Sequence, residues 1–182
     1  LVSDNWATNT LLDRVGGVSP VRDSARRLPL RDLELYDRVR DARTSEHPAT
    51  LSRSSAEGCI EFWRIMSSEN VGRRGARVLG WLRDGLDTSM VAARLGFDPL
   101  AHSEPSFGLS LVHKTGTDEG IRADTGVLSN GTRRIAYACL VNWTPTSGDA
   151  DRVHLVAALD LMGAVGLAAD AHLRDLSAPL RR

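Results

Sequence analysis

The sequence predicts an α+β fold in which a helical lobe accompanies an antiparallel sheet flanked by helices. Apolar residues recur every three or four positions through most of residues 1–108, the spacing of helices with one buried side. After residue 108 they alternate with polar residues in three runs, and a last helical stretch follows. We therefore divide the chain into a mainly helical lobe, residues 1–108, and a sheet lobe, residues 109–182.

The first two helices are marked by their start and stop signals. Ser3-Asp4-Asn5 provides side chains that cap a helix over residues 5–15, and Gly16-Gly17 ends that helix. Ser19-Pro20 is typical of another helix start, since serine caps and proline fits the first helical position. A second short helix is expected from there to about Leu28.

The rest of the first lobe is predicted as one long loop and two further helices. Residues 29–48 show no steady period and indicate a long surface loop, a kind of segment that is often functional. A helix is expected over residues 50–66, with Ser54 and Glu57 as a capping box. Residues 71–86 predict the next helix.

The sheet lobe begins where the period changes from 3.6 to 2. Strands are expected over residues 109–113, 123–129 and 134–143, and Asn130-Gly131 indicates a type I′ hairpin between the last two. A long helix is expected over residues 151–173. Three strands make a thin sheet, so we expect further strands from residues upstream of Leu1 or from another chain.

Composition excludes several classes of function. The 23 acidic and 23 basic residues are well mixed and cancel, which argues against a nucleic-acid-binding surface. No uninterrupted apolar run approaches the ~20 residues of a membrane span. The five histidines are isolated from one another and there is no glycine-rich phosphate loop, so we expect no metal and no other cofactor.

The only lysine of the chain, Lys114, lies in the segment Lys-Thr-Gly-Thr, whereas all other basic residues are arginines. At the end of an edge strand, this lysine would project an ammonium group into a cleft. Gly116 would let an extended acyl chain lie against the strand. Thr115 and Thr117 would add hydroxyl groups, and Thr117 a backbone N–H.

Two motifs together resemble a known family. The run S-D-N-W-A-T-N-T-L-L-D-R-V-G-G, which starts at Ser3, closely resembles the S-D-N segment of class A β-lactamases, and K-T-G follows in the expected order. The segment Leu79-Gly80-Trp81-Leu82 and the final hairpin and helix are also similar. The family's S-x-x-K motif, which carries the nucleophile, cannot occur here because no serine lies three residues before Lys114. The resemblance therefore implies a β-lactamase/transpeptidase-like fold whose N-terminal part lies outside this chain.

The resemblance also implies roles for individual residues. Ser3 and Lys114 would be catalytic: Ser3 would relay a proton to the departing amide nitrogen, and Lys114 would place positive charge near it. Asn5 would bind the side-chain amide of the substrate. The N–H of Thr117 would form half of an oxyanion hole. The substrate carboxylate would be held by Lys114, Thr115, Thr117 and Arg122.

The long loop departs from the family, because it lacks the E-P-x-L-N-like segment whose glutamate activates the deacylating water. The carboxylates available in this loop are Glu34, Asp37, Asp41 and Glu46.

The resemblance implies a serine hydrolase acting on a β-lactam or a related carboxylate-bearing amide, secreted or in the cell envelope. Its nucleophile would come from a missing N-terminal segment or a companion chain, and this chain alone would be inactive. Two alternatives stay open: a D,D-peptidase or penicillin-binding type of acyl enzyme, and a non-catalytic binding protein of the same fold.

Overall fold

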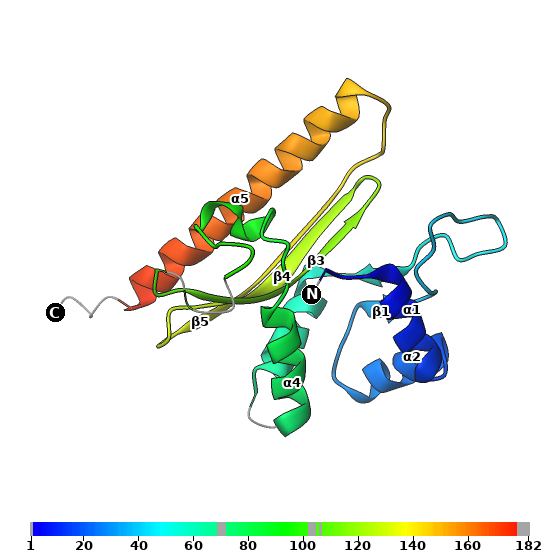
Figure 1. Ribbon diagram of the computed structural model, residues 1–182, viewed down its shortest axis with the longest axis horizontal. Coiled ribbons are helices and arrows are strands. Elements are labelled where there is room, and N and C mark those ends of the chain that lie inside the picture. The colour runs from blue at the N-terminus through cyan, green and yellow to red at the C-terminus, as the bar shows by residue number, and fades with distance from the viewer. Residues whose placement is uncertain (1, 69–71, 102–104, 106, 178–182) are drawn as a thin grey trace. The chain divides into compact units, whose positions relative to one another are not determined.

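The computed structural model describes residues 2–68, 72–101, 105 and 107–177 (Figure 1). Backbone packing divides the chain into two compact units, each described here by itself. The N-terminal unit comprises residues 2–62, and the sheet unit comprises the residues from Trp63 on. The division into lobes at residue 108 stays a prediction.

The three predicted strands form an antiparallel sheet in the order β3-β4-β5, as expected. Strand β3 spans Ser110–Asp118, β4 spans Ile121–Ser129 and β5 spans Arg134–Asn142. The prediction that β3 ends at His113 is wrong. The strand continues through Lys-Thr-Gly because its whole length pairs with β4, down to Asp118 opposite Ile121.

The hairpin between β4 and β5 is confirmed, but its turn is shifted by one residue from the predicted Asn130-Gly131 pair. The backbone N–H of Asn130 bonds to the carbonyl of Arg133, so Gly131 and Thr132 are the central residues. Gly131 has φ 87°, which suits a turn with glycine at its first central position. The Asn130 side chain accepts hydrogen bonds from the N–H groups of Thr132 and Arg133, which accounts for its place beside the turn.

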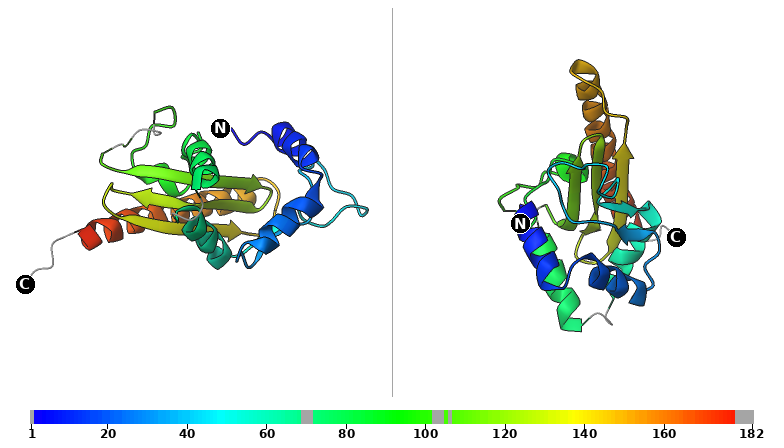
Figure 2. Two further views of the ribbon diagram at one scale, coloured as in Figure 1. Left: turned by 90° about the horizontal axis from the view of Figure 1, so that it is seen from below. Right: turned by 90° about the vertical axis from the view of Figure 1, so that its right-hand side faces the viewer.

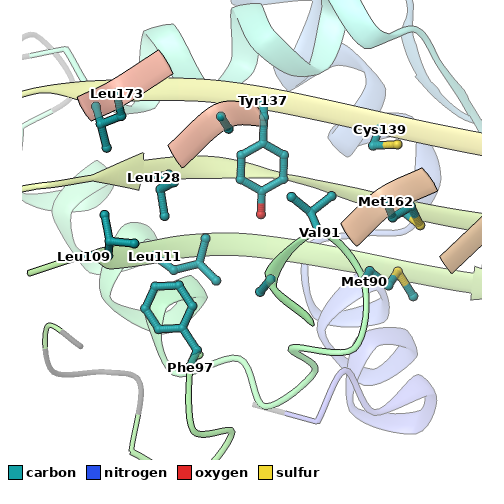
Figure 3. Packing of buried hydrophobic residues seen from close by; sticks show 12 residues of the cluster. Met90, Val91, Phe97, Leu109, Leu111, Leu128, Tyr137, Cys139, Met162 and Leu173 are labelled. Carbon is teal, nitrogen blue, oxygen red and sulfur yellow. The ribbon is translucent and has the colours of Figure 1, made fainter. Parts of the chain in front are cut away.

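The apolar core of the sheet unit lies between the sheet, the long helix α5 (Asp149–Ser177) and the 3₁₀ segment η2 (Val91–Arg94) (Figure 3). Leu111, Met162 and Leu173 are completely buried there. Gly166 allows α5 to approach η2, since a Cβ at Gly166 would collide with the carbonyl oxygen of Val91. Figure 2 shows α5 running alongside the strands.

Helix α5 is long and apolar enough, over Asp149–Asp175, to cross a bilayer by length and composition alone. Core helices of globular folds share these properties. Met162 and Leu173 of α5 are buried in the core, as such a helix requires. The helix is thus weak support for a membrane span, and the expected absence of a span stays a prediction.

Helix α4 (Gly72–Arg83) also belongs to the sheet unit and contacts β3. Its predicted first residue, Val71, lies outside the described residues.

The N-terminal unit opens with two helices, α1 (Asn5–Arg14) and α2 (Val18–Arg27). The predicted cap of α1 is confirmed, because Asp4 Oδ1 accepts the N–H of Ala7 at 2.6 Å. The predicted cap of α2 at Ser19 is wrong. The N-cap is Gly17, at φ 92°, without a side-chain bond, so the helix starts directly after the glycine pair.

A small sheet that the sequence did not reveal brackets most of the long loop. Strands β1 (Leu33–Leu35) and β2 (Ser52–Ser54) pair antiparallel and enclose the loop between them. Helix α3 (Ala56–Met66) therefore starts later than expected, and its first turn is capped by Ser55, whose Oγ accepts the N–H of Gly58 at 3.0 Å. The predicted capping box at Ser54 is wrong because Ser54 is part of β2.

Candidate active site

Lys114 lies in the middle of β3, directly opposite Thr125 of β4. Directly opposed residues share one face of an antiparallel sheet, so both side chains lie on the same face. The hydroxyl of Thr125 accepts a hydrogen bond from the indole Nε1 of Trp63 at 3.0 Å, and Trp63 is buried. The lysine therefore projects from the same face as a threonine that is bonded to a buried tryptophan.

The surroundings of the Lys114 ammonium change its acidity. Partial loss of water lowers the pKa of Lys114 below the ordinary 10.5, and the carboxylates of Asp87 and Asp124 offset part of this shift. The Nζ donates to the carbonyl of Thr115, and the residue remains exposed. An exposed ammonium with a lowered pKa can attract an anion and also release its proton more readily than an ordinary lysine.

The other members of the motif are divided between the two faces of the sheet. Thr115 is opposite Asp124 and Thr117 is opposite Arg122, so these side chains lie on the face away from Lys114. Burial alone would raise the pKa of Asp87, but hydrogen bonds from Ser89 and from the Thr115 hydroxyl lower it overall. The Thr115 hydroxyl is therefore already hydrogen-bonded to a carboxylate of the protein itself, that of Asp87.

Gly116 lies on the same face as Lys114, opposite Ala123. A Cβ at Gly116 would lie 3.6 Å from the Cβ of Ala123, an ordinary van der Waals contact. Packing within the described residues therefore does not require a glycine there, and the role of Gly116 in leaving room for a substrate stays a prediction.

The guanidinium of Arg122 is held at the turn between β3 and β4. It donates to the carbonyls of Asp118 and Ile121, at 2.9 and 2.6 Å, and its Cζ lies 5.9 Å from the ring centroid of Trp143. Lys114 and Arg122 are thus on opposite faces of the sheet. A shared carboxylate pocket would require the Arg122 side chain to leave those carbonyls, and its role stays a prediction.

Ser3 and Asn5 lie in the N-terminal unit, at the start of α1, and both are exposed. Ser3 has φ 55°, in the left-handed region that residues other than glycine rarely adopt. Strained residues of this kind cluster at functional sites. The proposed proton relay therefore has an unusual backbone conformation, which the sequence did not indicate.

Asn9 has a positioning role that was missed from the sequence, although it lies within the S-D-N segment. Its side-chain amide donates to the carbonyl of Val39 at 2.9 Å and accepts the N–H of Val39 at 3.0 Å. This pair of bonds ties α1 to the long loop. A groove of about 750 Å³ lies beside it, lined by Asp4, Asn5, Trp6, Asn9, Arg38, Val39, Arg40, Asp41 and Ala42.

The four carboxylates of the loop differ in their exposure and in their hydrogen-bond and ion-pair partners. Asp37 is 6% exposed and bound by Arg40 and Arg43, at 2.7 and 2.6 Å. Hydrogen bonds from Arg40, opposed by burial, hold the pKa of Asp37 far below its ordinary 3.8, so it is a poor proton acceptor. Glu34 accepts a bond from the Tyr36 hydroxyl. Asp41 is exposed and lines the same groove as Asn5, whereas Glu46 is exposed elsewhere on the loop.

No group of three or more histidine, cysteine or carboxylate side chains that could hold a metal ion occurs among the described residues. His113 is 2% exposed, and its Nδ1 lies 3.1 Å from Oδ1 of Asp124.

These features define a class of protein. The fold is that of the β-lactamases and penicillin-binding proteins, because the structure superimposes on several of them. One is a β-lactamase from Sphaerobacter thermophilus, with TM-score 0.71, 19% identity and coverage of 92% of this chain and 57% of that one. Another is the chromosome-encoded β-lactamase of Vibrio parahaemolyticus, with TM-score 0.69, 17% identity and coverage of 93% and 60%.

The third is PBP-A, for which a mutant has also been solved as an acyl-enzyme complex with penicillin G. This complex has TM-score 0.69 and 18% identity, and covers 94% of this chain and 58% of that one.

The chain belongs to the beta-lactamase enzyme family, whose model matches residues 1–165. The resemblance to class A β-lactamases and the predicted α+β fold are thereby confirmed. No curated protein sequence gives a match. The chain spans less than two thirds of the length of the solved structures it resembles.

Proposed function

We propose that this chain forms part of a serine hydrolase of the class A β-lactamase type. The enzyme acts by acyl-serine chemistry on a β-lactam or a related amide that carries a carboxylate. The observation that carries the proposal is the placement of the only lysine: Lys114 lies exposed on strand β3 of a β-lactamase fold, with a lowered pKa.

In this proposal the two motifs divide the chemistry. Lys114 supplies positive charge that attracts the substrate carboxylate and favours loss of the proton from Ser3. Ser3 passes a proton to the departing amide nitrogen, and Asn5 binds the substrate's side-chain amide. The backbone N–H of Thr117 contributes to the oxyanion hole, while Gly116 leaves space for the acyl chain. Thr115, Thr117 and Arg122 would add to the carboxylate pocket only if their side chains left the face of the sheet on which they lie.

The nucleophilic serine comes from residues outside this chain, either an N-terminal segment or a companion chain. Two features of the sheet unit support an added piece. Strand β5 has no partner beyond β4 in the described sheet, and free strand edges tend to pair. Helix α5 also bears apolar side chains on the side away from its buried residues, where Val153, Val156, Leu161 and Leu167 are exposed. A helix that is apolar on both faces is usually buried on both.

The loop carboxylates favour a second candidate, an acyl enzyme of the penicillin-binding type. Asp37 is held as an anion by two arginines and Glu34 is bonded to a tyrosine. Of the four loop carboxylates, Asp41 is the one that lines a groove with Asn5. If Asp41 does not activate water, the acyl enzyme forms and persists.

The test is the intact mass of the full-length protein, with whatever precedes Leu1, after incubation with a fluorescent penicillin. Release of hydrolysed penicillin without accumulated adduct supports the β-lactamase. A stable adduct on a serine outside this chain supports the penicillin-binding type. Neither adduct nor hydrolysis would refute both and leave a non-catalytic binding protein of this fold.

A further inference from the structure

Three elements of the sheet unit meet at one buried carboxylate. Asp124, on the middle strand β4, has no exposed surface. Its Oδ1 accepts the hydroxyl hydrogen of Tyr137 on β5 at 3.0 Å and lies 3.1 Å from Nδ1 of His113 on β3. Its Oδ2 accepts the backbone N–H of Val91, in η2, at 3.0 Å. A carboxylate can only accept, so the hydrogen at this contact is assigned to His113 Nδ1.

Gly126 provides the space for this arrangement. It is opposite both His113 and Tyr137 and lies two residues from Asp124 on the same face of β4. A Cβ at Gly126 would lie 2.6 Å from His113 Cβ and 2.9 Å from the Tyr137 hydroxyl oxygen. Those distances are too short for any side chain, so the glycine lets both neighbours lean across β4 toward Asp124. Figure 3 shows Tyr137 pointing toward Val91.

The network is directly linked to the K-T-G segment. His113 immediately precedes Lys114, and Asp124 is opposite Thr115, so β3 is tied to β4 on both sides of the lysine. The carboxylate of Asp124 also favours the charged form of Lys114. His113 also lies close enough to Asp87 to help lower the pKa of that carboxyl, and the hydroxyl of Thr115 donates a hydrogen bond to it.

Two further titratable groups face the carboxylate from β5. Burial raises the pKa of Tyr137 well above 10.0, and Asp124 adds to this shift. Burial and Asp124 also raise the pKa of the Cys139 thiol. Neither group therefore brings a second negative charge to the core near neutral pH.

We propose that Asp124, His113 and Tyr137 form a positioning network that sets the orientation and the charge state of Lys114. None of the three touches the substrate; they act through the backbone of β3 and through the field of one buried carboxylate. The proposal rests on the proposed function for its effect on acylation. Its effect on the lysine itself can be measured separately.

The first experiment compares two substitutions of His113 in the full-length protein. Asparagine places its amide nitrogen where Nδ1 stood and can still donate to Asp124, whereas the amide nitrogen of glutamine lies nearer to Nε2. We expect His113→Asn to acylate with a fluorescent penicillin within about threefold of the unchanged protein. Acylation of His113→Gln should be slower by about tenfold or more. Loss of the bond to Asp124 would shift Lys114, and small misplacements of a catalytic group are costly.

The second experiment measures Lys114 without turnover. Amine-reactive labelling is followed by mass spectrometry of the peptide that contains Lys114, at a fixed pH below its pKa. Replacing Asp124 with Asn removes the anion that favours the ammonium, so labelling should be about two- to fivefold faster. Leu173→Ala is the control: it opens the same core on α5, away from the network, and should lower Tm without changing the labelling rate.

The outcomes separate this proposal from the proposed function. Failure of the unchanged protein to react with penicillin refutes the proposed function. The labelling rate of Lys114 still tests whether the network controls the lysine. Equal acylation by the two His113 variants, or a faster Gln variant, overturns the proposal. So does unchanged labelling in Asp124→Asn. Should that variant not fold, the His113 pair is labelled instead, and only the Gln variant is expected to differ from the unchanged protein.

Discussion

The two units of this chain are stabilised in different ways. In the sheet unit, side chains such as Leu111, Met162 and Leu173 form a continuous apolar core. In residues 2–62, all of which the structure describes, the only buried residues are Asp37 and Gly58. Helices α1 and α2 bury none of their residues completely. The N-terminal unit depends instead on polar ties, the Asn9–Val39 pair and the ion pairs of Asp37.

The difference shows where stability and chemistry lie. Lys114 belongs to the unit with the apolar core, and Ser3 and Asn5 belong to the unit held by hydrogen bonds and ion pairs. Apolar burial is the main favourable term in folding, and a unit with little of it is marginal by itself. We therefore expect the sheet unit to govern global stability, and the polar ties to govern local order in the S-D-N region.

The largest expected effect is a loss of acylation rate at Lys114 with almost no change in the stability of the fold. Lys114→Ala should slow acylation of the full-length protein by about 100-fold or more, because it removes a charge aimed at the reacting groups. The free energy of unfolding should change by less than about 0.5 kcal/mol, since an exposed polar side chain contributes little to stability. Acylation kinetics with a fluorescent penicillin and urea denaturation measure the two effects. Unchanged acylation, or loss of the fold, would contradict the motif assignment.

The pH dependence refines that prediction. The pKa of Lys114 is lowered, so its ammonium is lost at lower pH than that of an ordinary lysine. Acylation should therefore decline on the alkaline side at a pH below 10.5. Lys114→Arg keeps its charge and should not show this decline, whatever its lower overall rate.

The next largest effect tests the apolar core. Leu128→Ala should lower the free energy of unfolding by about 2–5 kcal/mol, because Leu128 is 1% exposed and the truncation leaves a cavity. Chemical denaturation measures the loss. The matched variant Leu35→Ala, at a half-buried leucine of β1, should cost clearly less. Equal losses would show that the N-terminal unit depends on apolar packing as much as the sheet unit does.

A smaller effect concerns the ion pairs of the long loop. Asp37→Asn removes the anion that binds Arg40 and Arg43, so residues 36–48 should be cut faster in limited proteolysis. The folded pKa of Asp37 is depressed, so its contribution is present above the ordinary 3.8 and is lost only as the pH falls through the lower folded value.

The difference in urea midpoint between Asp37→Asn and the unchanged protein should therefore persist at pH 3.8. Asp41→Asn, at an exposed carboxylate of the same loop, is the control and should leave proteolysis unchanged. A difference that disappears well above pH 3.8 would mean that Asp37 is not held by the arginines.

The smallest effect concerns the tie between α1 and the loop. Asn9→Ala loses two hydrogen bonds to Val39 and should destabilise this region by about 1–2 kcal/mol. Hydrogen exchange at the Val39 amide should become faster while amides of β4 are unaffected. Thr10→Ala, which loses only a bond to the Trp6 carbonyl within α1, should leave the Val39 amide protected.

The existence and order of elements with a long, regular period were predicted correctly from the sequence, although β3 was expected to end too early, at His113. The three strands, the cap of α1 at Asp4 and the final helix follow from local patterns of polarity and from short-range capping. The pair β1–β2 was missed because its strands are three residues each and lie far apart in the chain. The starts of α2 and α3 were misplaced, by two and six residues, because several neighbouring residues could act as caps.

The candidate site was only partly predictable. Lys114, Ser3 and Asn5 were found because their motifs are short and contiguous. Asn9 could have been found from the same segment, since it lies within the S-D-N run. No local signal marks Asp124, whose partners come from three other elements, or the bond between Asp87 and Thr115, which lie far apart in the sequence.

The sequence by itself determined the family, the order of the elements and the residues of the two motifs. These are properties of neighbouring residues and of the spacing between them. Tertiary structure alone decided which side chains share a face of the sheet, which carboxylates are engaged and how Lys114 is tuned. Pairing of β3 with β4 placed Lys114 and Arg122 on opposite faces, and burial of Asp124 on the middle strand surrounded one carboxylate with three donors. Such effects depend on distances between residues that are remote in sequence, and they arise only when the chain is folded.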